Sequence, residues 1–435
     1  MTDRRFPLGI QTFEKIRTGR YTYVDKTKYI YDMTHTFQYA FLSRPRRFGK
    51  SLLVSTLKSY FEGRRDLFEG LAIEGLEQEW KQHPVILISL ASAKGGTVES
   101  VKNTIGSGLG DIERWLGIER KSNEPGDRFK DIVLGCAEKY DNLPVVLIDE
   151  YDVPLQHAFF QTLKTYREGA PGALPPEYSQ SFYQQMARFI RELFEPIVKP
   201  PATEITAPDE SASAIYRTIM TGCLRVSKES IFTGANNLTV SGVGDDDGLQ
   251  DLCGFTAQET VALLKQKGLD LHKDTVRDWY DGYHFGHDNL VDIYCPWDVI
   301  SYCDAHAKAP SAKRHPQCYW VNTSGNDLIY DCLAHLSEDV SNAFQTLLDG
   351  GTVYAETDDH ITFDELWGQS SGSRLFTLLY LTGYLTVYKE PDETEKPGNT
   401  DEKDGKDKTN KPGKTAKTAK ARTAKQAALP SKADE

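Results

Sequence analysis

The sequence lacks any run of about eighteen consecutive apolar residues, so it predicts no transmembrane helix. Its first residues, Met1–Pro7, include no apolar stretch of the kind that a secretory signal needs, and we expect a cytoplasmic protein. Basic residues are in the minority, 51 against 63 acidic ones, and the formal net charge is −12. This balance excludes a protein that is basic as a whole and coats nucleic acid.

Cysteine is also scarce. The seven cysteines form no C-x-x-C pair, which argues against a disulfide scaffold and favours reduced thiols. A loose group of cysteine and histidine residues raises the question of a zinc site: Cys295, Cys303, His306, His315 and Cys318. Their spacing matches no zinc knuckle, and core cysteines with surface histidines are the preferred interpretation.

What the chain does have is 39% hydrophobic and 11% aromatic residues, enough for a sizeable core. Its 435 residues correspond to about three domains at roughly 150 residues each. The pattern of predicted strands and helices, together with the composition, divides it instead into two domains and a tail, at 1–237, 238–389 and 390–435.

The tail is predicted to be disordered, because Leu429 is its only large apolar residue. Residues 408–432 hold seven lysines, Arg422 and no acid. Such a strip suits non-specific contact with DNA or RNA. A solubilising tail without a partner is an equally open alternative.

Strands and helices alternate in the first domain. Helical periodicity begins at Lys50 and recurs over Phe129–Tyr140 and Phe182–Phe194. Apolar runs predict the strands between them: Tyr39–Ser43, Pro84–Leu90, Pro144–Ile148 and Ile215–Thr221. This alternation is typical of an α/β fold, a parallel sheet flanked by helices.

The second domain is predicted to be mainly helical. Thr256 and Glu259 form a capping box at one helix start, and Pro296 suits the first turn of another. The domain ends in a helix, a turn at Gly383 and a strand over Tyr384–Tyr388, an order that suggests a winged helix.

The segment Ser43–Ser51 reads S-R-P-R-R-F-G-K-S and lies between a predicted strand and a predicted helix, where a P-loop belongs. Gly49 lets the backbone curl around a phosphate, Lys50 reaches the β- and γ-phosphates, and Ser51 offers its hydroxyl to Mg²⁺. We take Arg46, Arg47, Phe48, Gly49, Lys50 and Ser51 as candidate nucleotide ligands. Arg44 stands where the G-x-x-x-x-G-K-[ST] pattern has its first glycine.

A second signal lies about one hundred residues downstream, where the apolar strand Val145–Ile148 ends in Asp149 and Glu150. Asp149 is placed to hold Mg²⁺, and Glu150 to activate the attacking water. On their own, two acids after a strand fit a helix cap or a turn equally well. Together with the lysine loop they predict a P-loop NTPase, with Lys50 and Glu150 as its catalytic residues.

Weaker candidates complete the site. Thr221 follows the next predicted strand, where its hydroxyl is placed to sense the γ-phosphate or to cap the strand end. Arg225 and Lys228 are candidates for a transition-state cation or for surface charges. Of Arg46 and Arg47, we expect one to meet phosphate and the other to pair with an acid.

These segments resemble the AAA-ATPase-like family of predicted bacterial and archaeal ATPases. The resemblance runs from Pro7 to about Lys389, and the distinctive loop F-L-S-R-P-R-R-F-G-K-S-L-L is accompanied by V-V-L-I-D-E-Y-D-V-P-L, P-L-G-I-Q-T-F-E-K-I-R, Y-V-D-K-T, Y-F-E-G, S-I-F-T-G-A-N-N-L, W-Y-D-G-Y-H-F and L-T-G-Y-L-T. It implies that the nucleotide is ATP and that arginine is normal at position 44. It gives no role for Tyr283, His284 or Phe285.

Family members often carry a PD-(D/E)XK nuclease-like domain at the C-terminus, where this chain has its lysine-rich tail. The triplet Glu79-Trp80-Lys81 is a coincidental match to a nuclease motif, so any nuclease role requires a partner chain. Two functions follow: an Mg²⁺-dependent ATPase whose hydrolysis rearranges the two domains, or an interaction module that ATP gates with little hydrolysis. A protein partner and an oligomer are compatible with either.

Overall fold

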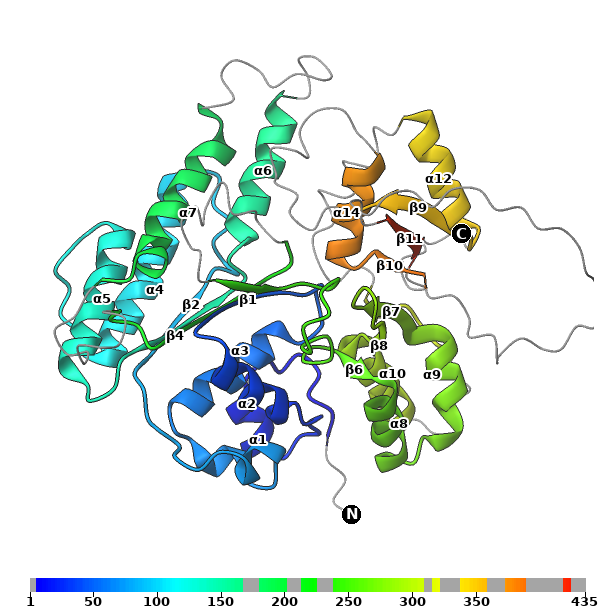
Figure 1. Cartoon of the computed structure of the whole chain (residues 1–435), viewed down its shortest axis with the longest axis horizontal. Helices are drawn as coiled ribbons and strands as arrows, with labels where there is room; N and C mark the ends of the chain where they lie inside the picture. Colours follow the sequence, from blue (N-terminus) through cyan, green and yellow to red (C-terminus); the bar gives the residue numbers. More distant parts are fainter. Residues whose placement is uncertain are drawn as a thin grey trace, which may run out of the picture.

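The computed structural model describes residues 5–166, 180–201, 213–224, 238–308, 315–320, 337–357, 372–388 and 418–423. Figure 1 shows a central sheet with α1 to α3 on one side and α6 and α7 on the other, while the C-terminal elements pack beyond one edge. These first helices are α1 (Phe13–Thr18), α2 (Thr27–Thr36), α3 (Lys50–Phe61), α6 (Val153–Tyr166) and α7 (Phe182–Val198).

The central sheet is parallel, as the alternation of strands and helices predicts. Its order is β2-β3-β4-β1-β5, with the strands β1 (Tyr39–Ser43), β2 (Val85–Ser89), β3 (Val145–Asp149), β4 (Arg217–Gly222) and β5 (Thr239–Ser241). Every residue of β1 and β3 is buried, which explains their continuous apolar runs. Because all pairings are parallel, β1, β4 and β3 end side by side at one edge.

Two long helices, α4 (Val98–Leu116) and α5 (Pro125–Lys139), complete the layer beside α7. A buried ion pair joins them, since Arg128 donates 2.8 Å hydrogen bonds to both carboxylate oxygens of Glu113. The predicted helices over Phe129–Tyr140 and Phe182–Phe194 correspond to α5 and α7. Sequence periodicity thus located the elements to within a few residues.

The sheet continues past the predicted boundary at residue 237, because β5 pairs with β1 through Ala40, Phe41 and Leu42. Beyond it, the C-terminal half contains the predicted helices, with the capping box of α8 (Ala257–Gln266) and Pro296 at the start of α10 (Pro296–Lys308). The other helices are α9 (Lys273–Tyr280), α12 (Glu338–Leu348) and α14 (Gly372–Thr382).

Two small antiparallel sheets accompany these helices. One has the order β6-β8-β7, from Phe255–Thr256, Val291–Tyr294 and Asp281–Phe285; the other has the order β10-β11-β9, from Leu385–Val387, Thr418–Thr423 and Val353–Glu356. Apart from β10, which lies in the predicted strand over Tyr384–Tyr388, these strands lack the continuous apolar runs that mark the central strands. The helix, the turn at Gly383 and the strand that follows it are observed as expected; the likeness to a winged helix stays a prediction.

The predicted tail, 390–435, lies outside the described residues except for β11. This strand pairs antiparallel with both β9 and β10. Backbone hydrogen bonds alone define a middle strand of this kind, and a composition without large apolar residues does not reveal it. Within the described part of the chain, no helix combines the length and apolarity needed to cross a membrane.

Candidate functional site

A cavity of about 470 Å³ opens at the edge where the parallel strands end. It is lined by Arg46, Arg47, Gly49, Lys50 and Ser51 from the loop after β1, by Glu150 and Asp152 after β3, by residues 7–11 near the N-terminus and by Pro296, Trp297 and Ile300 of α10. Both halves of the chain therefore contribute walls to one cavity.

The loop after β1 turns through two left-handed residues, Arg47 with φ 71° and Gly49 with φ 93°. Lys50 begins α3, and its ammonium donates 2.9 Å hydrogen bonds to the backbone oxygens of Arg44 and Pro45. Burial lowers the pKa of Lys50, but the interaction of the ammonium with Cys223 and the nearby carboxylates of Asp152 and Glu150 outweigh it and raise the pKa. The lysine is thus held as a cation at the floor of the loop.

Arg44 is fully buried rather than exposed at the mouth of the loop. Its guanidinium donates to the backbone oxygens of Ser43, Ser241 and Leu249 and to the hydroxyl of Ser241, at 2.8–3.0 Å. The side chain therefore ties the start of the loop to β5 and the segment that follows it, a role that the missing glycine did not suggest.

The two acids at the end of β3 have different surroundings. Asp149 is buried, and its carboxylate accepts a 2.7 Å hydrogen bond from the hydroxyl of Thr221 at the end of β4. Glu150 lines the cavity and has φ 55°, a conformation that non-glycine residues rarely adopt. Burial, and next the charge of Asp149, raise the pKa of Glu150 above its usual value. A carboxylate with a raised pKa beside a phosphate loop suits proton abstraction from water.

A third acid, Asp152, was missed by the sequence analysis. Its Oδ2 accepts hydrogen bonds from the backbone N–H groups of Cys223 and Leu224, both 2.9 Å, and from the side chain of Gln156, 2.6 Å. The amide oxygen of Gln156 in turn accepts a 2.9 Å hydrogen bond from Arg46. The signal was present in the sequence as D-E-Y-D, but nothing there shows which of the three acids faces the next strand.

The other loop residues point toward the C-terminal half. Arg47 lies over the ring of Trp297, 4.7 Å from its centroid. Phe48 is buried and packs edge-on against Tyr283, with ring centroids 4.9 Å apart. Phe48 is therefore no wall of the cavity, and only its backbone remains available to a nucleotide. The family resemblance left Tyr283 and Phe285 without a role. In the structure, both rings pack against the ring of Phe48.

Three backbone oxygens of the loop accept contacts from the C-terminal half. Phe48 accepts from the N–H of Gly254 at 3.0 Å, Arg46 from the indole of Trp320 at 3.3 Å, and Arg47 from the thiol of Cys295 at 3.9 Å. The phosphate loop is thus held from the side that the sequence assigned to a separate domain. Arg225 and Lys228 lie outside the described residues.

The donors expected for Mg²⁺ fit the ion chemically. The hydroxyl of Ser51 and the carboxylate of Asp149 are hard oxygen ligands, and two protein ligands leave the further positions that Mg²⁺ fills with phosphate and water. Within the described residues, the carboxylate of Asp149 accepts one hydrogen bond, from the hydroxyl of Thr221 to Oδ1.

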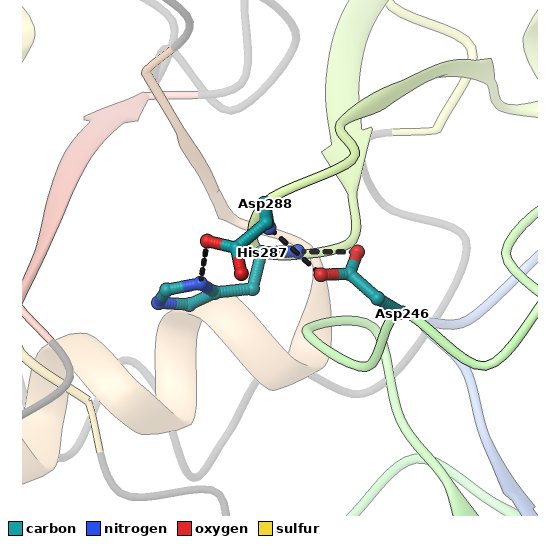
Figure 2. Close-up of side chains that lie close together, drawn as sticks. All are labelled: Asp246, His287 and Asp288. Atoms are coloured by element: carbon teal, nitrogen blue, oxygen red, sulfur yellow. Dashed lines mark hydrogen bonds and ion pairs between the residues drawn. The ribbon is translucent and has the colours of Figure 1, made fainter.

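A second group of possible metal ligands lies on the surface, comprising Asp246, His287 and Asp288 (Figure 2). The Asp246 carboxylate there accepts backbone N–H groups from His287, Asp288 and Asn289, at 2.8–3.3 Å. These hydrogen bonds lower the pKa of Asp246 and fix the turn between β7 and β8. The arrangement is a turn cap. Among the described residues, the cysteines and histidines from 295 to 318 do not come together as a group of metal ligands.

The sequence model of the family described as predicted AAA-ATPase matches residues 7–232, which is more than half of the chain. The chain belongs to this family. The match covers the phosphate loop and the acid-ended strand described above.

Two similar proteins give a further comparison. An uncharacterized protein encoded in the vnfD 5′ region of Azotobacter chroococcum mcd 1 is 29% identical over 388 residues, or 89% of this chain. The chain spans 65% of the length of that relative. A Walker-type ATPase of Pyrococcus abyssi superposes with a TM-score of 0.42 at 12% identity, covering 89% of this chain and 94% of the other.

Proposed function

We propose that this chain binds ATP with Mg²⁺ in the cavity at the sheet edge and hydrolyses it. One observation carries the proposal: Glu150, with its left-handed backbone and raised pKa, lines the same cavity as Lys50 and Ser51. A left-handed glutamate costs of order 1–3 kcal/mol, and such strain is concentrated at functional sites.

Each residue of the site has a separate role in the proposed reaction. The N–H groups around Gly49 and the ammonium of Lys50 bind the β- and γ-phosphates, so Lys50 exchanges its loop carbonyl partners for phosphate oxygens. Ser51 and Asp149 would hold Mg²⁺, which would supply positive charge to the phosphate oxygens. Glu150 accepts a proton from the water that attacks the γ-phosphorus. Thr221 holds Asp149 in position through its hydroxyl.

Hydrolysis is proposed to change how the C-terminal half holds the loop. The contacts from Gly254, Cys295 and Trp320 end on backbone oxygens of the residues that surround the phosphates. A loop that opens to admit or release phosphate must strain these contacts, and this links the nucleotide state to the C-terminal half.

The test is phosphate release from the full chain, compared with Lys50→Ala and Glu150→Gln. We expect Glu150→Gln to bind ATP normally and to lose at least about 100-fold in turnover, since general bases contribute on this scale. Lys50→Ala is expected to weaken ATP binding as well. Equal turnover in all three proteins would refute the enzymatic proposal. Tight ATP binding with background turnover in the wild type would favour the ATP-gated interaction module instead.

Contact of the basic strip 408–432 with DNA or RNA remains a prediction. Because β11 lies within this strip, the test replaces the lysines outside β11 (Lys408, Lys411, Lys414, Lys417, Lys425 and Lys432) with glutamine and leaves the strand in place. DNA is then titrated at two salt concentrations, because a phosphate contact loses affinity steeply as salt rises. An unchanged affinity and salt slope would show that these lysines make no such contact.

A further inference from the structure

A chain of hydrogen bonds leads from the end of β3 to the cavity through Asp152, Gln156 and Arg46. The acid is anchored firmly: it is 1% exposed, and two backbone N–H groups from the end of β4 bind its Oδ2. The same oxygen accepts from the Gln156 amide at 2.6 Å, and the Gln156 oxygen accepts from Arg46 at 2.9 Å. One turn of α6 therefore connects a buried acid to a basic side chain of the phosphate loop.

The chemistry of the neighbours fixes the direction of this chain. A carboxylate only accepts hydrogen bonds and a guanidinium only donates them, so the Gln156 amide has one orientation that satisfies both. The absence of a side chain at Gly222 leaves room for Asp152, because a Cβ there would lie 2.5 Å from the Tyr151 ring and 3.0 Å from the Asp152 carboxylate. The arrangement holds the Arg46 guanidinium through the amide oxygen of Gln156.

Arg46 is also the loop arginine in the right place to meet phosphate. It precedes Lys50 by four residues and lines the cavity with Lys50 and Glu150. Its backbone oxygen is held by the indole of Trp320. Arg47, by contrast, has its guanidinium over the Trp297 ring. A guanidinium matches the geometry of phosphate oxygens better than an ammonium does, because it donates two parallel hydrogen bonds.

We propose that Arg46 contacts the terminal phosphate of ATP from within the same chain, and that Gln156 and Asp152 are positioning residues for it. This inference rests on the proposed function and adds the cation that stabilises the charge on the transferred phosphoryl group. It also makes the site sensitive to the third phosphate, because Arg46 would bind ATP and leave ADP without this contact.

The first experiment compares affinities of the full chain for a non-hydrolysable ATP analogue and for ADP. We expect Arg46→Ala to lower the affinity for the ATP analogue about 10- to 100-fold, the usual size of a lost charged hydrogen bond, and to change ADP affinity less than about 3-fold. Arg114→Ala, at an exposed arginine of α4, is the matched control and should change neither. An Arg46→Ala protein with the wild-type ratio of the two affinities would overturn the proposal.

The second experiment tests positioning. Gln156→Ala should reduce the preference for the triphosphate in the same direction as Arg46→Ala, and the double variant should be no worse than Arg46→Ala, since Gln156 acts through Arg46. Gln161→Ala, on the same helix but outside the cavity, is the control. Effects of the two substitutions that multiply would overturn the positioning role.

Failure of the inference and failure of the proposed function can be told apart. A wild type that prefers the ATP analogue but has the turnover of Glu150→Gln refutes hydrolysis and leaves Arg46 supported. A wild type that hydrolyses ATP while Arg46→Ala keeps both turnover and preference refutes Arg46 alone. A wild type that binds neither nucleotide refutes both.

Discussion

At the scale of single residues, Arg44 explains how this loop does without its first glycine. A side chain at this point would crowd a conventional loop, but here it turns into the protein and makes four hydrogen bonds to Ser43, Ser241 and Leu249. Three of the acceptors are backbone oxygens, and of these Leu249 also accepts from the N–H of Leu252. Buried backbone oxygens need such donors. The arginine is therefore a structural part of the loop.

Restoring the consensus should consequently destabilise the protein. We expect Arg44→Gly to lower the free energy of unfolding by at least about 3 kcal/mol, because buried acceptors lose a charged donor and the side chain leaves a void. Urea unfolding measures this effect. Arg120→Gly, at an exposed loop arginine, should stay within about 0.5 kcal/mol of the wild type. A stable Arg44→Gly protein would contradict the structural role.

The raised pKa of Glu150 predicts the acid limb of the pH profile. A general base works only when deprotonated, so turnover falls as pH drops through the pKa of Glu150. Burial and Asp149 place that pKa above 4.5, the ordinary value for glutamate. The measurement is kcat against pH at saturating Mg²⁺ and ATP, with ATP binding followed over the same range. A limb at or below pH 4.5, with binding intact, would exclude Glu150 as the base.

At the scale of elements, the turn between α14 and β10 touches the phosphate loop. Gly383 has φ 91°, and a Cβ there would lie 2.9 Å from Cβ of Pro45. The sequence predicted the turn from its glycine, but not its contact with a loop more than three hundred residues away. Glycine is required at position 383 for two reasons, the positive φ angle and the close approach of Pro45.

A matched pair of substitutions separates these two requirements. Gly350 also has a positive φ, 84°, but a Cβ there would have nothing within 4 Å. We expect Gly350→Ala to lose about 1 kcal/mol of stability from backbone strain, and Gly383→Ala to lose more because its Cβ also meets Pro45. Only Gly383→Ala should also weaken ATP binding, because it displaces Pro45. Titration with the ATP analogue measures the difference, and equal ATP affinity in both variants would rule out coupling through the turn.

The elements of the site differ in how much the sequence revealed. The loop at Lys50 and the acids at the end of β3 are local patterns, since strand, turn and helix follow one another along the chain. The partners of these residues are distant in sequence: Thr221 for Asp149, Ser241 for Arg44 and Trp320 for Arg46. Such pairs depend on strand order, which no local pattern encodes. The candidate catalytic residues could therefore be predicted from the sequence, whereas the residues that hold them in position could not.

At the scale of the whole molecule, the two halves share one structure around the phosphate loop. Residues of the C-terminal half line the cavity, seat Phe48 and hold three backbone oxygens of the loop. Beneath these contacts lies Asp298 of α10, which is fully buried. The thiol of Cys295 and the N–H groups of Tyr319 and Trp320 approach its carboxyl group, but neither oxygen has a full hydrogen-bond partner.

This buried acid should make stability depend on pH in an unusual direction. Burial raises the pKa of Asp298 to about 7 from 3.8, so the folded protein keeps a proton that the unfolded chain releases. Between these values the unfolded state binds fewer protons, and its formation becomes easier as pH rises. Stability associated with Asp298 is therefore complete below about pH 4 and is lost by about pH 7.

Asp298→Asn tests this directly, because the amide cannot lose its proton. Relative to the wild type, the variant should gain roughly 3 kcal/mol in unfolding free energy between pH 5 and pH 8, from about 1.4 kcal/mol per pKa unit. Asp339→Asn, at an exposed acid of α12, should gain nothing over that range. The titratable groups near Asp298 are Cys295, Cys318, Tyr280 and Tyr283, whose own pKa values are raised, so they stay neutral below pH 8 and do not mask the effect. The prediction is wrong if the unfolding free energies of Asp298→Asn and the wild type differ by a constant amount from pH 5 to pH 8. Asp298 would then already be charged in the folded protein, and its buried surroundings would tolerate the charge.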